Sequence, residues 1–159
     1  MQTPTERTPF KTRLGFTLVE LLIVIAVIAI LASAAYPSFA EFVRKGRRAS
    51  ARGAIAEMLQ QQERLMTQTG SYRPLAVGES GTPFRTHTGD SPSGASYLLA
   101  ASPCSGGGTT ASTLPLTQCV QVSAVPQQAD PAAGTLWMDS TGQKDCDGTR
   151  KAEPRLCWP

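Results

Sequence analysis

Residues 15–25 read Gly-Phe-Thr-Leu-Val-Glu-Leu-Leu-Ile-Val-Ile and open an apolar run that continues to Ala35. Within residues 16–35 the only charged side chain is that of Glu20. A helix of this length measures about 30 Å, which is enough to cross the hydrocarbon core of a bilayer. A carboxylate at mid-membrane depth costs roughly 2.5–3.5 kcal/mol, so an ordinary anchor would not carry one. We therefore predict a membrane helix over residues 16–36 in which Glu20 is functional.

This stretch resembles the processing site of class III signal peptides, which are found in type IV pilins and related pseudopilins. In that family a prepilin peptidase and N-methylase cuts after the glycine and methylates the new N-terminal phenylalanine. The resemblance implies a leader peptide over residues 1–15, cleavage after Gly15 and N-methylation of Phe16. A proline that the family carries early in the mature chain corresponds to Pro37. The alternative is a conventional signal cut near Ala34, although such signals have a shorter apolar region of roughly 7–15 residues.

Cleavage after Gly15 would give Glu20 a natural partner. It leaves an α-amino group on Phe16 with a reference pKa near 7.7–8.0, and methylation keeps its charge. Glu20 lies four residues further on, one helical turn away. The resemblance implies that amine and carboxylate pair between neighbouring subunits and set their register. A Glu20 carboxylate that only snorkels toward the membrane surface is the alternative.

Residues 37–69 are rich in good helix formers and predict an amphipathic stalk helix. Its apolar face recurs at helical spacing through Ala51, Ala54, Ile55, Met58, Leu59, Gln62, Leu65 and Met66. One helix is expected over residues 16–68, ending before Gly70 and kinked near Pro37, because proline lacks an N–H. A basic cluster on this stalk is read as structural, with a phosphate contact as the alternative; its members are Arg44, Lys45, Arg47, Arg48 and Arg52.

Residues 70–159 are predicted to form a globular head. Residues 70–94 are rich in Gly, Ser, Thr and Pro and indicate an irregular segment. Four short runs bounded by Gly and Pro then predict strands over residues 96–101, 118–125, 135–139 and 143–146. We expect an α+β fold in which an antiparallel sheet of about four strands packs on the stalk helix, as the pilin resemblance also implies.

All four cysteines lie in the predicted head, outside the cytoplasm, where disulfides persist. Three pairings are possible. Spacing favours Cys104 with Cys119, around a glycine-rich excursion at residues 105–108, and Cys146 with Cys157 in a C-terminal loop. Zinc is the alternative, but the chain has no Cys-x-x-Cys and only one histidine.

Composition and charge argue against several function classes. Charged residues make up 17 % of the chain, against roughly 25 % in an average soluble domain. Two of the three net positive charges belong to residues 1–15, so net charge does not indicate a nucleic-acid partner. His87 stands alone without a catalytic motif, and neither an enzyme nor a cofactor is expected. The carboxylates that come nearest to a calcium site lack EF-hand spacing; they are Asp139, Asp145 and Asp147.

The ending Cys157-Trp158 resembles minor pilins of the type IVa kind. We therefore predict a structural, minor subunit of a type IV pilus, with roles in adhesion, twitching motility or DNA uptake left open. Its partners would be other pilins, the prepilin peptidase and an inner-membrane assembly platform. The expected location is the inner membrane, single-pass, and then the surface pilus, with the head periplasmic or extracellular.

Two alternatives to a structural minor pilin remain. A type II secretion pseudopilin is disfavoured by the two cysteine pairs and the Cys-Trp ending. A receptor pilin that binds DNA during natural transformation is suggested by basic residues around the C-terminal cysteine loop, namely Lys144, Arg150, Lys151 and Arg155. Acidic residues interleaved with these cations dilute the signal.

Overall fold

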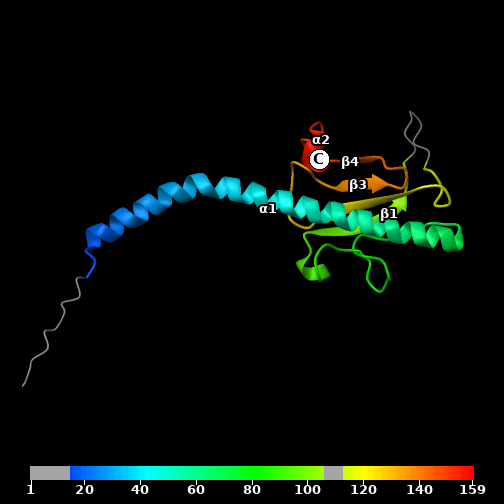
Figure 1. Ribbon diagram of the computed structural model, residues 1–159, viewed down its shortest axis with the longest axis horizontal. Helices are drawn as coiled ribbons and strands as arrows, with labels where there is room; N and C mark the ends of the chain where they lie inside the picture. Colours follow the sequence, from blue (N-terminus) through cyan, green and yellow to red (C-terminus); the bar gives the residue numbers. More distant parts are fainter. Residues whose placement is uncertain (1–14, 106–112) are drawn as a thin grey trace, which may run out of the picture. The chain divides into compact units, whose positions relative to one another are not determined.

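The computed structural model of the chain describes residues 15–105 and 113–159 (Figure 1). The elements follow in the order α1 (Leu18–Thr69), a short 3-10 helix η1 (Pro92–Gly94), β1 (Tyr97–Pro103), β2 (Val120–Pro126), β3 (Leu136–Asp139), β4 (Lys144–Cys146) and α2 (Pro154–Cys157). The long N-terminal helix and the four strands confirm the predicted α+β architecture. The chain divides into two units, Met1–Ala40 and Glu41–Pro159.

The described part of the first unit is the beginning of α1. The Thr17 hydroxyl accepts a hydrogen bond from the Glu20 backbone N–H at 3.2 Å, which caps this helix two residues later than predicted. No single helix in the described residues meets the length and hydropathy of a membrane span, whereas Leu18–Ser33 and Ser38–Thr69 meet them as a bent pair. The bounds of α1 run through Pro37, and a local kink at this proline stays a prediction.

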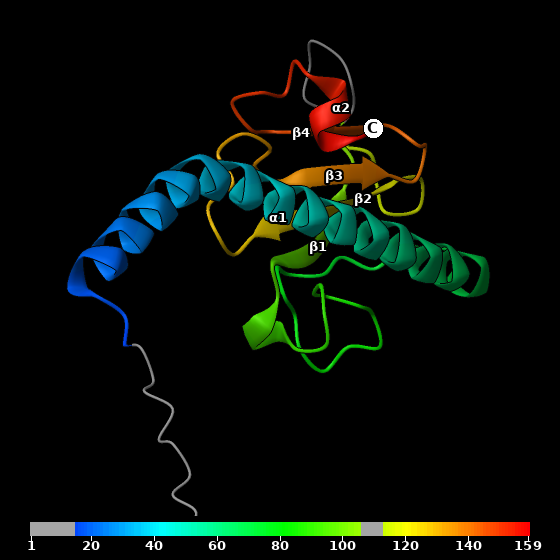
Figure 2. The same ribbon diagram turned by 60° about the vertical axis from the view of Figure 1, so that its left-hand side comes forward.

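In the second unit, α1 packs along the sheet through its predicted apolar face. The side chains of Ala51, Ile55 and Met58 are fully buried, and Gln62 is buried beside them. Figures 1 and 2 show this part of α1 lying across one face of the strands. The helix ends at Thr69. Gly70 follows with a φ of +76°, which glycine adopts at little cost, and its N–H donates to the Met66 carbonyl at 2.8 Å.

The sheet is antiparallel with strand order β1-β2-β3-β4. On β2 the side chains of Val120, Val122 and Ala124 are buried, while those between them are half-buried. This alternation is the period-2 pattern of a strand with one face on a core. The strands begin one or two residues later than predicted, and the register is fixed by pairs such as Leu99 with Ala124.

Two disulfides fasten the ends of the sheet. Cys104 pairs with Cys119 across the connection between β1 and β2, with Cα atoms 5.6 Å apart. Cys146 pairs with Cys157, joining β4 to α2 with Cα atoms 6.2 Å apart. These are the two pairings that the spacing favours. Most of the glycine-rich excursion lies outside the described residues, since its residues 106–108 belong to the gap.

Candidate functional site

The first part of α1 presents an apolar surface with one carboxylate. Large side chains from Leu18 to Leu31 are exposed, and Phe16 before them is 78 % exposed. Among the described residues, the Glu20 side chain, also exposed, has no ion-pair partner. An exposed apolar stretch of this size marks a surface that is covered by lipid or by another protein.

Two of the four predicted DNA-contact residues meet beside an aromatic ring. The Lys144 Nζ lies 5.5 Å from the centroid of the Trp158 ring, a cation–π distance. The indole N–H of Trp158 donates to the Asp145 carbonyl at 3.0 Å, which fixes the ring. One cavity of about 200 Å³ is lined by Lys144, Lys151 and Trp158 together with Asp145 and the disulfide-bonded Cys157. The structure therefore joins two exposed cations and a half-buried ring in one place, here called the lysine–tryptophan site.

The other two predicted contacts lie elsewhere. Arg150 donates two hydrogen bonds to Glu153, at 2.8 and 2.5 Å, and this hydrogen-bonded carboxylate raises the pKa of the guanidinium. Its charge is largely compensated. Arg155 lines a second cavity, away from Lys144 and Lys151. The four basic residues thus do not form the single track that their closeness in sequence suggests.

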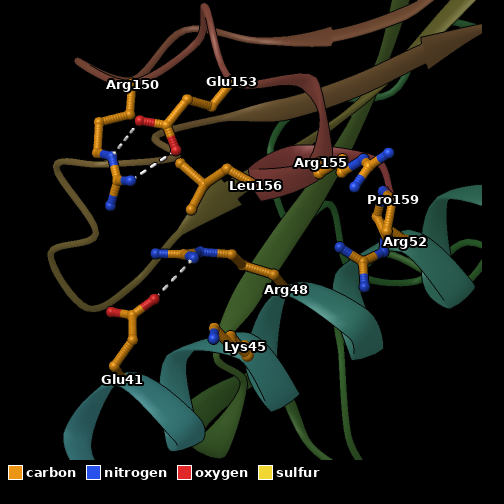
Figure 3. A pocket seen from close by; sticks show the side chains of 9 residues that line it. All are labelled: Glu41, Lys45, Arg48, Arg52, Arg150, Glu153, Arg155, Leu156 and Pro159. Carbon is orange, nitrogen blue, oxygen red and sulfur yellow. Dashed lines mark hydrogen bonds and ion pairs between the residues drawn. The ribbon is translucent and has the colours of Figure 1, made fainter. Parts of the chain in front are cut away.

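The second cavity, here called the basic pocket, lies between α1 and the C-terminal segment and measures about 490 Å³ (Figure 3). Five of its lining side chains are cations and two are carboxylates. It is lined by Glu41, Lys45, Arg48, Arg52, Arg150, Glu153, Arg155, Leu156 and Pro159. Arg52 donates one hydrogen bond, at 2.9 Å, to the Cys157 carbonyl. Burial and the neighbouring Arg48 charge both lower the pKa of Arg52.

Arg48 is a buried member of the stalk's basic cluster. Its side chain is 1 % exposed and forms a two-pronged ion pair with Asp130, with Nε to Oδ2 at 2.6 Å and Nη2 to Oδ1 at 2.7 Å. Its Nη1 donates to Glu41 at 3.2 Å, and the Tyr97 hydroxyl donates to Asp130 at 3.3 Å. Arg48 therefore fastens α1 to the loop after β2 and is occupied within the chain.

The protonation states of this network follow from its contacts. Burial acts to raise the pKa of Asp130, but the hydrogen bonds and charge of Arg48 outweigh it and hold that pKa below its ordinary value. The hydrogen bond with Asp130 raises the pKa of Arg48. Burial first, and the Asp130 charge second, raise the pKa of Tyr97 to about 12. Near neutral pH the carboxylate and the guanidinium are thus charged while the phenol is neutral.

The acidic residues that come nearest to a calcium site accept hydrogen bonds from backbone N–H groups. Asp139 accepts hydrogen bonds from the N–H groups of Thr141 and Gln143, both at 2.9 Å, and so shapes the turn between β3 and β4. Asp147 accepts from the Thr135 N–H at 2.6 Å. The Asp139 carboxylate also lies within 4.8 Å of the sulfurs of Cys104 and Cys119, but these sulfurs are joined in a disulfide and are not available as thiolate ligands.

Sequence reasoning missed both the role of Arg48 and the aromatic partner of Lys144. A signal for Arg48 exists, since it lies three residues before Ala51 and seven before Ile55, on the buried face of the helix. Its partner Asp130 is 82 residues away, and no local pattern relates the two.

Comparison with known families covers both units. The family described as "Type IV minor pilin ComP, DNA uptake sequence receptor" matches residues 37–146. The "Prokaryotic N-terminal methylation motif" matches residues 10–36, a range that includes Gly15, Phe16 and Glu20. No curated protein matches the chain. Because the first match spans more than half of the chain, this protein belongs to the ComP family of type IV minor pilins and is a subunit of a type IV pilus.

Proposed function

We propose that this minor pilin binds double-stranded DNA as a receptor subunit of its pilus. The observation that carries the proposal is the family match over residues 37–146, because the family is described as a DNA uptake sequence receptor. The lysine–tryptophan site supports it, since exposed lysines neutralise backbone phosphates. Trp158 offers an aromatic surface beside those cations.

The structure ranks the basic residues by their availability. Lys144 and Lys151 are exposed and have no carboxylate partner among the described residues. Arg150 is held by Glu153, so its contribution to phosphate binding is expected to be smaller. Phosphate contacts alone carry no sequence information, and any preference for an uptake sequence requires contacts to base edges or to DNA shape.

Fluorescence anisotropy of labelled duplex DNA with the mature chain in detergent micelles tests this proposal. Replacing Lys144 and Lys151 together by alanine should abolish binding, and each single variant should reduce the salt slope by about one unit. Arg64→Ala is the matched control, because Arg64 is exposed on α1 away from the lysine–tryptophan site. Absence of DNA retention even at low salt would overturn the proposal, and competition with unrelated duplex measures sequence preference.

We further propose how the chain enters the pilus. The leader, residues 1–15, is removed after Gly15 by a prepilin peptidase, and Phe16 is then N-methylated. Residues 16–36 hold the chain in the inner membrane before assembly and pack in the filament core afterwards. Residues 37–69 form the stalk, and residues 70–159 form the periplasmic and then extracellular head. The methylation-motif match and the exposed apolar start of α1 support this course.

In the assembled filament, the Glu20 carboxylate would pair with the Phe16 amine of a neighbouring subunit. The partners are other pilins and the inner-membrane assembly platform, and the protein acts by assembly and binding rather than by catalysis. Intact-mass measurement tests the processing step, since the mature chain should begin at Phe16 and carry one added methyl group. A chain that starts at residue 1 or after Ala35 would contradict it.

A further inference from the structure

The basic pocket contains more positive charge than its own carboxylates compensate. Arg48 is occupied by Asp130 and Glu41, and Arg150 by Glu153. Among the residues that the structure describes, neither Lys45 nor Arg155 has a hydrogen-bond or ion-pair partner for its side chain. Arg52 donates only one of its N–H groups, to a carbonyl. Within residues 15–105 and 113–159, these three cations therefore have no carboxylate at ion-pair distance.

We propose that this pocket binds an acidic side chain of a neighbouring pilin subunit, held by Lys45, Arg52 and Arg155. α1 supplies Lys45 and Arg52 from one wall, and the C-terminal segment supplies Arg155 from the other (Figure 3). A planar guanidinium binds a carboxylate through two parallel hydrogen bonds, and a lysine adds a point charge. Burial first, and the Arg48 charge second, lower the pKa of Arg52, and an anion between the walls would relieve the repulsion between these two arginines.

The size and charge of the pocket favour a protein carboxylate over a DNA phosphate. A cavity of about 490 Å³ accommodates a side chain but not a duplex. Glu41 and Glu153 also line it and would repel the successive phosphates of a polyanion more than one carboxylate. Apolar surface from Leu156 suits the stem of an acidic side chain.

Two observations indicate that the partner is a pilin: the family to which the chain belongs and the exposure of the pocket's cations. The family places this chain in a pilus, where it lies among other pilins. The side chains of Lys45 and Arg155 are exposed, so a pilin that contacts the second unit has access to these cations. This inference concerns filament contacts and is independent of DNA binding at the lysine–tryptophan site.

Carbodiimide cross-linking of sheared pili from cells that express the full chain tests the inference. The reagent joins a lysine amine to a contacting carboxylate as an amide with loss of water. Mass spectrometry should find the Lys45 peptide joined to an Asp or Glu peptide of another pilin subunit, and isotope-mixed cells should distinguish a second copy from the same chain. Lys45→Arg keeps the charge and should lose this product while incorporation into pili is retained.

Charge reversal gives the second measurement. Lys45→Glu combined with Arg155→Glu should lower the amount of this chain in sheared pili by at least about tenfold, because attraction becomes repulsion. Arg64→Glu is the matched control, because Arg64 is exposed and lies outside both the basic pocket and the lysine–tryptophan site. Membrane levels and both disulfides should be unchanged, since the reversed side chains are exposed.

Two results would overturn the inference. One is unchanged incorporation of the charge-reversed chain, and the other is Lys45 cross-linked only to Glu41 or Glu153 of its own chain. If the charge-reversed chain is incorporated normally but loses DNA binding, the pocket is a phosphate site instead. Failure of the Lys144 and Lys151 variants to affect DNA binding would leave this inference unaffected.

Discussion

Arg48 illustrates how the head accommodates a buried charge. Desolvation of two ions costs several kcal/mol each, and their attraction repays it only when the geometry is good and the remaining polar atoms are satisfied. Here both carboxylate oxygens of Asp130 accept from the guanidinium, and Tyr97 adds a third hydrogen bond. Among the described residues, no buried side-chain N or O atom lacks a partner. The pair therefore specifies how α1 docks on the loop after β2.

Removing one partner of this pair should be costly. Arg48→Met leaves the Asp130 carboxylate buried without its counter-ion, and we expect a loss of about 3–5 kcal/mol in the free energy of unfolding. Guanidinium denaturation of residues 41–159 with intact disulfides measures it. The double variant with Asp130→Leu should recover most of the loss, because no unpaired charge remains. A single variant as stable as the parent would contradict this account.

The same carboxylate predicts a stability change in acid. The folded-state pKa of Asp130 is lowered, whereas its unfolded pKa is near 3.9. Its contribution is therefore fully present above about pH 4 and is lost as the pH falls through the folded pKa. The denaturation midpoint, measured from pH 7 down to pH 2, should decrease as the pH drops below about 4. Asp130→Asn should flatten that part of the curve, and an unchanged slope in the variant would contradict the prediction.

Arg48 also marks the limit of sequence-based prediction at this scale. The helical period predicts that Ala51, Ile55 and Met58 are buried, and the structure buries them. The same period places Arg48 on that face, but its charge argues for a solvated position. Only the distant Asp130 makes its burial acceptable, and a contact across 82 residues has no local signature.

At the scale of elements, the helix and the strand with the clearest periodic pattern of apolar residues were predicted best. Apolar residues that recur every 3.6 positions predicted α1, and those that alternate with a period of 2 predicted β2, because each element packs one face against the core. Strand ends differ from the prediction because pairing with neighbours decides them. Residues 70–94 were predicted to be irregular, yet Leu75 and His87 form single bridges with β1, at Ala101 and Leu98. Such pairing depends on the tertiary fold rather than on residue preference.

The disulfide between Cys146 and Cys157 has a defined task among these elements. α2 has four residues and is too short to persist alone, so this bond holds it against β4. Replacing both cysteines by serine should cost about 2–4 kcal/mol in thermal unfolding experiments. It should also weaken DNA binding, because Lys151 and Trp158 are no longer held beside Lys144.

The other disulfide supplies a matched control. Serine at both Cys104 and Cys119 should lower the stability by a similar amount, since this bond also closes a short loop, of 15 residues against 11. It should leave DNA binding intact, because neither sulfur lines the lysine–tryptophan site. Equal loss of DNA binding in the two variants would show that the C-terminal disulfide has no specific role in positioning that site.

At the scale of the whole molecule, the two units carry different surfaces. The first exposes an apolar helix that requires lipid or other subunits, and the second carries the sheet, both disulfides and both charged cavities. The sequence predicted the methylation motif of the first unit, which the family match over residues 10–36 confirms, because that signal is local and linear. It located the basic residues of the second only by their position in the chain. Their division between two cavities follows from how α2 and β4 fold against α1.

The proposed role of Glu20 in assembly allows the most discriminating test of the pilin mechanism. At 4 Å and an effective dielectric of 20, its attraction to a neighbour's Phe16 amine is worth roughly 4 kcal/mol. Glu20→Ala should therefore be inserted and processed normally, with a mature mass that begins at Phe16, but be depleted from sheared pili. Asp90→Ala is the control, since that carboxylate is exposed, belongs to the second unit and lies outside both charged cavities. Immunoblots of membranes and of sheared filaments measure both pools. Normal incorporation of Glu20→Ala would exclude the charge pair, whereas loss of processing would mean that Glu20 serves the peptidase instead.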